Sequence, residues 1–288
     1  MKKQEEILKT YITPDFVYIP IKENTNILIN QNKNILTYEV FGNFKNEKYY
    51  SYVSGKVIGT SEILATNNMS KALVVENNFK ENKYKHTGVI NDNISFKRKE
   101  VSEILSMYGI SINFTSKKIL YATYNYSHCD LCDSFLIRNN CTLFLEALDT
   151  LKSIYKLDKV FIVIKNKDLL EELNNYIGTY YNIETINISD KALTNISKKK
   201  ENILMDINDI LEIYNLLKYN IMPKNKYITI NYNKKSILLL VKLGSNVFNV
   251  LKHLEIDTNS KIMIYGNSIL EVSEKVIITK DVRYIEVL

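Results

Sequence analysis

The sequence predicts an α+β protein with three parts: an all-β barrel or sandwich, a central α/β part with a parallel sheet, and a compact ββαβ unit. Three observations predict this class. Short runs of β-branched and aromatic residues fill 14–79, and apolar strands alternate with helical patterns over 101–188. Strand runs then return after Tyr227 around one short helix. The 288 residues are enough for about two or three domains.

The first part reads as a series of short strands separated by polar Asn, Lys, Ser and Gly residues. Ser54 and Gly55 lie between two of these runs. They predict a hairpin, because glycine adopts the positive φ of a tight turn without steric cost. The predicted strands are residues 16–21, 26–30, 35–40, 49–53, 56–59 and 72–76.

The central part alternates strands with helices. A helix over 101–109 ends at Gly109, and a helix over 140–155 begins at Asn139 or Asn140. A β-α-β-α-β order favours a parallel sheet with crossover helices. The remaining elements predicted here are strands at 118–123, 160–164 and 183–188 and helices at 168–177 and 205–219, the last ending before Pro223.

The last part contains predicted strands at 227–230, 236–241 and 262–266. A short helix over 247–254, starting at Ser245 or Asn246, lies between the second and third of them. The sequence therefore predicts a small ββαβ unit of about 60 residues.

Charge and hydropathy exclude several classes of protein. The 38 basic and 32 acidic side chains are mixed along the chain, and the basic clusters at 97–99 and 198–200 are too short for a nucleic-acid footprint. The aliphatic run at 237–241 is far below the roughly 20 residues of a membrane span. Three cysteines and no apolar leader indicate a reducing, cytoplasmic compartment. We expect no nucleic-acid partner and no membrane insertion.

Cys129 and Cys132 form the one concentrated chemical motif, a CxxC that follows the predicted strand at 118–123. We expect it on a loop at the carboxyl end of that strand, where α/β proteins commonly place their sites. Two thiols at this spacing can exchange electrons as a dithiol, one attacking and one resolving. Alternatively, both are small, partly buried residues without a chemical role.

A metal site is the third interpretation of the same motif, with His128, Cys129, Cys132 and Cys141 as ligands of zinc or of an iron–sulfur centre. Adjacent His128 and Cys129 would ligate one tetrahedral ion only under strain, and Cys141 falls in the next predicted helix. The dithiol is therefore favoured over the metal. The charge of nearby Asp130 and Asp133 disfavours a thiolate.

No other motif supplies a candidate catalytic residue. The sequence contains no Gly-x-Ser-x-Gly, no His-Glu-x-x-His and no Gly-x-x-x-x-Gly-Lys. It therefore does not predict an independent enzyme.

Three segments together resemble the RnfC-type subunits of bacterial electron-transport complexes. Residues 49–59 (YYSYVSGKVIG) and 72–78 (ALVVENN) resemble the family's "sPvSGkV" hairpin and "ivieND" strand. Residues 202–223 are similar to its helix "vvvNNveTl-aiy-AvkygkP", and 227–288 to its SLBB module, with Leu243-Gly244-Ser245 at the "iGTp" turn. The match includes the PrdC-type members that are associated with proline reductase.

The resemblance implies three domains. These are an RnfC-type barrel-sandwich hybrid over 10–80, a reduced α/β domain over 95–222 similar to the flavin-bearing subunit of complex I, and an SLBB-like, β-grasp-like module over 225–288.

The family's cofactor motifs are missing from this sequence. Residues 108–117 carry one glycine where the family has the flavin loop "GlGGAGFPTh-K", and residues 127–133 replace its acidic "ECEP". The "GGDE" insertion before residue 205 is also missing, and no CxxCxxC…CP run occurs. The departures imply a shortened relative without flavin or [4Fe-4S] sites.

The resemblance thus implies an electron-transfer accessory protein, with Cys129 and Cys132 as its dithiol relay. Its partners would be a redox enzyme or subunits of an electron-transport complex, through which it could associate peripherally with a membrane. Two alternatives stay open: a non-catalytic scaffold or docking subunit of the same complex, and a protein that binds a small ligand through the SLBB module.

Overall fold

The computed structural model describes residues 7–65, 68–84, 97–110, 112–123, 130–266 and 269–288. The protein is a mixed α+β structure, with seven helices and several sheets in these ranges. The chain divides into two compact units. The first comprises residues 1–87, 107–109 and 223–288, and the second comprises 88–106 and 110–222. The three-domain organisation inferred from the resemblance stays a prediction.

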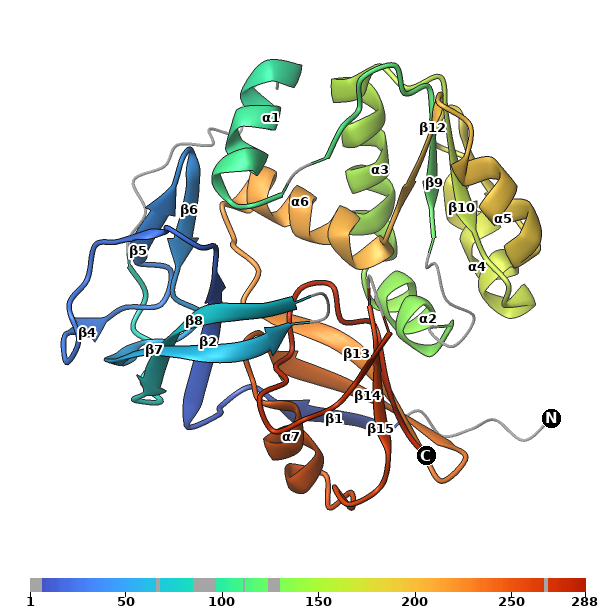
Figure 1. Cartoon of the computed structure of the whole chain (residues 1–288). Helices are drawn as coiled ribbons and strands as arrows, with labels where there is room; N and C mark the ends of the chain where they lie inside the picture. Colours follow the sequence, from blue (N-terminus) through green and yellow to red (C-terminus); the bar gives the residue numbers. More distant parts are fainter. Residues whose placement is uncertain (1–6, 66–67, 85–96, 111, 124–129, 267–268) are drawn as a thin grey trace. The chain divides into compact units, whose positions relative to one another are not determined.

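The amino-terminal part of the first unit consists of two antiparallel sheets (Figure 1). Alternating burial of Val17, Ile19 and Ile21 along β2 shows that one face of the first sheet is directed into a core. That sheet has the order β2 (Phe16–Ile21), β8 (Asn68–Asn77), β7 (Gly55–Ala65), β4 (Asn34–Ile35). The second has the order β3 (Asn26–Ile27), β5 (Val40–Phe44), β6 (Glu47–Tyr50).

The predicted hairpin at Ser54-Gly55 is wrong. The chain leaves β6 in one sheet and enters β7 in the other, so the strands on either side of Gly55 do not pair. Gly55 instead faces β8 so closely that an added Cβ would lie 1.9 Å from the carbonyl oxygen of Glu76. Glycine is required here by the approach of two backbones, and the tight turn of the region lies between β5 and β6.

The carboxyl-terminal part of the first unit is a six-stranded mixed sheet with α7 (Val247–His253). One aliphatic core beneath it includes Ile228, Leu239, Val250 and Ile285, all fully buried. The strand order is β1 (Ile7–Tyr11), β14 (Lys235–Lys242), β13 (Asn225–Tyr232), β17 (Tyr284–Val287), β15 (Ile262–Tyr265), β16 (Ile269–Glu271). The sequence predicted β13, β14, α7 and β15, but not the three remaining strands.

Residues far apart in the sequence join the two parts of this unit. The amide of Tyr18 donates to the carbonyl oxygen of Gly244 over 2.9 Å. Gly244 has a φ of +81°, and a Cβ there would lie 2.4 Å from the Tyr18 carbonyl oxygen. Ile63, Ala72 and Ile277 form a small buried cluster across the same junction. The unit is therefore one body built from both ends of the chain.

The second unit is built on a four-stranded parallel sheet, which confirms the parallel sheet predicted for the central part. Its order is β11 (Ile183–Ile186), β10 (Lys159–Val163), β9 (Ile119–Ala122), β12 (Asn202–Met205). Its helices are α1 (Arg98–Met107, whose last residue is grouped with the first unit), α2 (Asp130–Asn139), α3 (Cys141–Tyr155), α4 (Lys167–Ile177), α5 (Asp190–Ser197) and α6 (Ile207–Tyr219).

Polar caps start three of these helices. The side chains of Asn166, Ser189 and Asp206 accept hydrogen bonds from backbone amides in the first turns of α4, α5 and α6. The prediction started this helix at Met205, but Met205 ends β12. Helix α6 begins at Ile207, directly after the Asp206 cap. Helices α2 and α5 and strand β12 were not predicted.

Helices cover both faces of the parallel sheet (Figure 1). Leu120, Val160 and Ile162 are fully buried, and they alternate with Tyr121 and Phe161 along β9 and β10, so the two sets lie on opposite faces of the sheet. On the other face, Tyr121 and Phe161 stack with ring centroids 5.2 Å apart and pack with Leu193 of α5. Within the described ranges no helix has the length and apolar character needed to cross a membrane.

Candidate functional site

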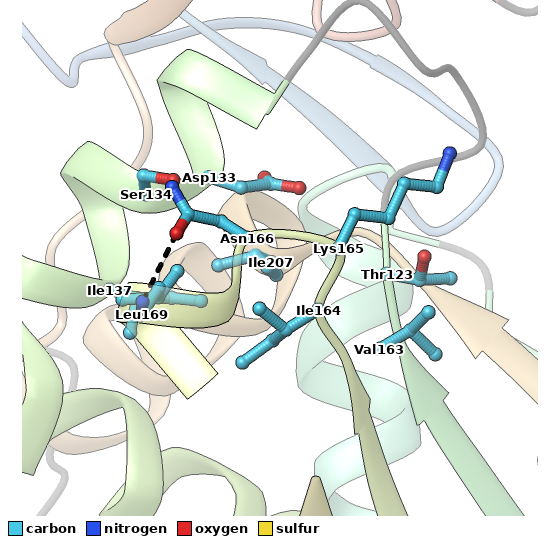
Figure 2. A pocket seen from close by; sticks show the side chains of 10 residues that line it. All are labelled: Thr123, Asp133, Ser134, Ile137, Val163, Ile164, Lys165, Asn166, Leu169 and Ile207. Carbon is cyan, nitrogen blue, oxygen red and sulfur yellow. Dashed lines mark hydrogen bonds between the residues drawn. The ribbon is translucent and has the colours of Figure 1, made fainter. Parts of the chain in front are cut away.

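The carboxyl edge of the parallel sheet holds the candidate site of the second unit (Figure 2). Parallel strands end together here, so the residues that follow them converge. Thr123 follows β9, Lys165 and Asn166 follow β10, and Asp133 and Ser134 come from α2. Two hydroxyls, an amide and a carboxylate thus line one small cavity, with apolar side chains from β10, α2, α4 and α6 beneath them. The Lys165 side chain extends away from these groups (Figure 2).

The cavity has a volume of about 20 Å³. One water molecule fills a space of about this size, whereas pockets for drug-sized molecules or cofactors occupy about 300–1,000 Å³. Asn166 cannot turn into the cavity freely, because its Oδ1 accepts from the amides of Asp168 and Leu169 over 3.0 and 3.2 Å. The site fits a bound water or a small ion, and it has no space for the ring system of a flavin.

Cys132 lies inside helix α2, not on a loop, so its predicted position is wrong. The helix begins directly at Asp130 and turns the Cys132 side chain into the core, where it is 0% exposed. Cys129 and His128, the other members of the motif, lie outside the described residues. The structure therefore places one of the two predicted thiols, and that thiol is out of reach of solvent.

Cys141 begins helix α3 and is half-buried. Burial, and next the negative charge of Glu172, raise the pKa of its thiol. A raised pKa keeps the thiol protonated at neutral pH, and the thiol is a poorer nucleophile and metal ligand than the thiolate.

The described residues include no group of three or more His, Cys, Asp or Glu side chains arranged to hold a metal ion. Two of the four predicted ligands, His128 and Cys129, fall outside these ranges, so the ligand set stays a prediction.

Sequence reasoning missed the polar residues of the sheet edge. Thr123 is the last residue of one predicted strand, Lys165 directly follows the next, and Asn166 precedes a predicted helix. Polar residues at the ends of two neighbouring parallel strands were the available signal. Asp133 and Ser134 could not be placed in the same way, because α2 itself was not predicted.

Comparison with known proteins gives distant structural likenesses only among solved structures. No family model matches the sequence, and no curated protein matches it. The NAD+-reducing [NiFe]-hydrogenase in its air-oxidized state is similar with a TM-score of 0.45 at 7% identity, over 60% of this chain and 40% of that chain. Its H2-reduced state gives a TM-score of 0.46 at the same identity and coverage.

The chain thus spans about two fifths of the hydrogenase chain that it resembles. A TM-score below 0.5 does not establish a common fold. The function of the hydrogenase therefore does not transfer to this chain through the likeness.

Proposed function

We propose that this chain is a docking subunit of a redox complex of the RnfC type and that it holds partner subunits without passing electrons itself. The sequence resemblance over 17–78, 202–223 and 227–288 supports the choice of complex. The structure is relevant to the second half of the proposal, that this chain itself passes no electrons.

The burial of Cys132 is the observation that carries the proposal. A dithiol relay needs one sulfur that reaches a partner's redox centre and a second that reaches the first, since thiol–disulfide exchange proceeds through direct attack of a thiolate on sulfur. Cys132 is 0% exposed within α2. The burial of Cys132 excludes this thiol as the sulfur that meets a partner.

Replacing the motif cysteines in the assembled complex tests the proposal. Cells that lack the native chain receive the tagged wild type, Cys129→Ser or Cys132→Ala, and the recovered complex is assayed for subunit content and for NADH-driven dye reduction. Cys141→Ser is the matched control, because this thiol lies on α3 outside the motif.

We expect all three variants to recover the same subunits and the wild-type rate of dye reduction. If Cys129→Ser assembles fully but reduces the dye no faster than cells without the chain, electrons pass through the dithiol and the chain is a carrier.

A further inference from the structure

The first unit contains a cavity of its own. It has a volume of about 440 Å³, within the range of about 300–1,000 Å³ for small-molecule sites. Most of its lining comes from four stretches of the chain, around residues 20, 50, 108 and 280, and Ala65 and Leu243 complete it. Tyr108 and Gly109 begin the segment that stands in place of the family's flavin loop, and residues 243 and 278–281 belong to the SLBB-like segment, but neither the resemblance nor the sequence motifs say which ligand this cavity takes.

Tyrosine rings form one wall of this cavity. Tyr50 packs edge-on against Tyr52 and Tyr108, with ring centroids 5.7 and 5.9 Å apart, and Tyr49 also lines the space. Edge-to-face arrangements of this kind are the ones that aromatic rings prefer, so a further flat ring extends the same packing. Burial raises the pKa of the Tyr49 and Tyr108 phenols, so both stay neutral hydrogen-bonding groups.

Lys280 supplies a positive charge beside this wall. Its Nζ lies 5.9 Å from the centre of the Tyr50 ring and 3.4 Å from the carbonyl oxygen of Tyr108. These neighbours are neutral, and the adjacent Asp281 carboxylate accepts a hydrogen bond from the Thr279 hydroxyl. Of the other two lysines that line the cavity, Lys22 is paired with Glu47 and Lys48 is exposed.

The turn that carries Lys280 is fixed by buried groups. The Lys280 carbonyl oxygen accepts from Arg283 Nη1 over 2.9 Å and from the ammonium of Lys226, which is 1% exposed. The amide of Arg283 donates to the carbonyl oxygen of Tyr265 over 2.7 Å. A cation on a turn that is held in this way is preorganised, so little ordering cost is left when a ligand binds.

We infer that this cavity binds a flat aromatic carboxylate, with its ring against the tyrosine wall and its carboxylate on the Lys280 ammonium. A cationic ligand does not fit, because Lys280 already lies over the Tyr50 ring. An aliphatic anion would satisfy Lys280 but leave the aromatic wall without a matching surface. The inference is independent of the docking function proposed above.

Calorimetric titration of the full chain tests the inference with three probes: indole-3-acetate, its uncharged amide, and cyclohexane carboxylate. We expect indole-3-acetate to bind at least about tenfold more tightly than either of the other two, the factor that corresponds to ~1.4 kcal/mol. Equal binding of the amide or of the non-aromatic acid overturns the inference, as does no heat of binding at millimolar indole-3-acetate.

Variants at Lys280 test whether indole-3-acetate binds in this cavity and not elsewhere on the protein surface. Lys280→Met is expected to lose at least about tenfold in affinity for indole-3-acetate, and Lys280→Arg to retain most of it. Lys252→Met is the matched control, because Lys252 is exposed on α7 and does not line the cavity. If Lys280→Met does not fold, Tyr108→Leu replaces it with the same expected loss. Unchanged affinity in the folded variant contradicts the proposed site.

Discussion

At the scale of single residues, one carboxylate in the first unit forms ion pairs with two lysines. Glu81 Oε2 lies 3.0 Å from Lys224 Nζ, and Oε1 lies 3.3 Å from Lys242 Nζ. Lys242 is 1% exposed, so its ammonium is almost fully removed from water. Burial, and next the charge of Lys224, lower the pKa of Lys242. The cluster thus depends on Glu81 to balance a buried positive charge.

Glu81→Gln is expected to destabilise the protein by about 1–3 kcal/mol at pH 7, since it leaves a buried ammonium without its anion. Urea unfolding measures the difference. Glu62→Gln is the matched control, because Glu62 pairs with Lys275 over 3.9 Å with both side chains exposed, and it should cost less than about 1 kcal/mol. An equal loss of unfolding free energy in both variants would show that the burial of Lys242 does not strengthen the contribution of Glu81 to stability.

The same cluster predicts a dependence on pH. The hydrogen bond from Lys224 holds the pKa of Glu81 below its ordinary value. A carboxyl whose pKa is lower in the folded state stabilises the protein above its unfolded pKa, and this contribution disappears as the pH falls through the folded pKa. The gap in unfolding free energy between wild type and Glu81→Gln should therefore shrink from pH 7 to pH 3. A gap that stays constant would contradict the pairing.

Cysteine reactivity follows from burial. In the native protein Cys132 should be alkylated at least about a hundredfold more slowly than in urea, because its thiol is enclosed in α2. Cys141 should react at an intermediate rate that rises with pH above the ordinary thiol pKa. Peptide-resolved mass spectrometry after timed iodoacetamide treatment measures both rates. Fast native labelling of Cys132 would contradict its described position.

At the scale of elements, periodicity predicted those with a strong local pattern. The apolar run at 160–164 and the helical spacing of Phe144, Leu148 and Leu151 needed no information from elsewhere in the chain. Helix α5 has only eight residues, but its Ser189 cap could have indicated its start. Strands β12 and β17 are four residues long and pair with strands distant in the sequence. Local propensity could not predict such elements, because their partners create them.

Gly55 illustrates the same limit. The sequence correctly marked a position where only glycine fits, but it supplied the wrong reason, since the close neighbour is Glu76 on a strand twenty residues away. Prediction of the candidate site was limited in the same way. Thr123 and Lys165 lie at the ends of predicted strands, but Asp133 lies on α2, which was not predicted.

Gly55→Ala is expected to destabilise the protein by about 2 kcal/mol or more, because a Cβ 1.9 Å from the Glu76 carbonyl oxygen forces β7 and β8 apart. Thermal and urea unfolding measure the change. Gly178→Ala serves as the control: its φ is −56° and an added Cβ meets nothing within 4 Å, so stability should change little. Similar behaviour of the two variants would refute the close approach.

At the scale of the whole molecule, the first unit is assembled from both ends of the chain. Strand β1 pairs in parallel with β14, from Ile7↔Ile237 to Tyr11↔Val241, more than two hundred residues apart. Tyr11 also contacts His253 of α7, with ring centroids 5.0 Å apart. No local pattern could have shown this pairing, and it means that the ββαβ unit at the carboxyl end is completed by the amino end.

Deletion of residues 1–12 is expected to loosen the edge of that sheet. Amides in Ile237–Val241 that bond to β1 should exchange with deuterium at least about tenfold faster, while amides of the parallel sheet at 119–122 keep their rates. Hydrogen exchange followed by mass spectrometry measures both segments. Unchanged exchange along β14 would mean that β1 does not pair there in solution.

The central claim is that the chain holds a redox complex together without carrying electrons. Coulometric titration of the purified full chain, first oxidised and then reduced stepwise, tests it most directly by counting the electrons taken up per chain. The account predicts no uptake above that of a Cys129→Ser variant. An uptake of two electrons, the amount for a dithiol couple, that disappears in this variant would contradict it.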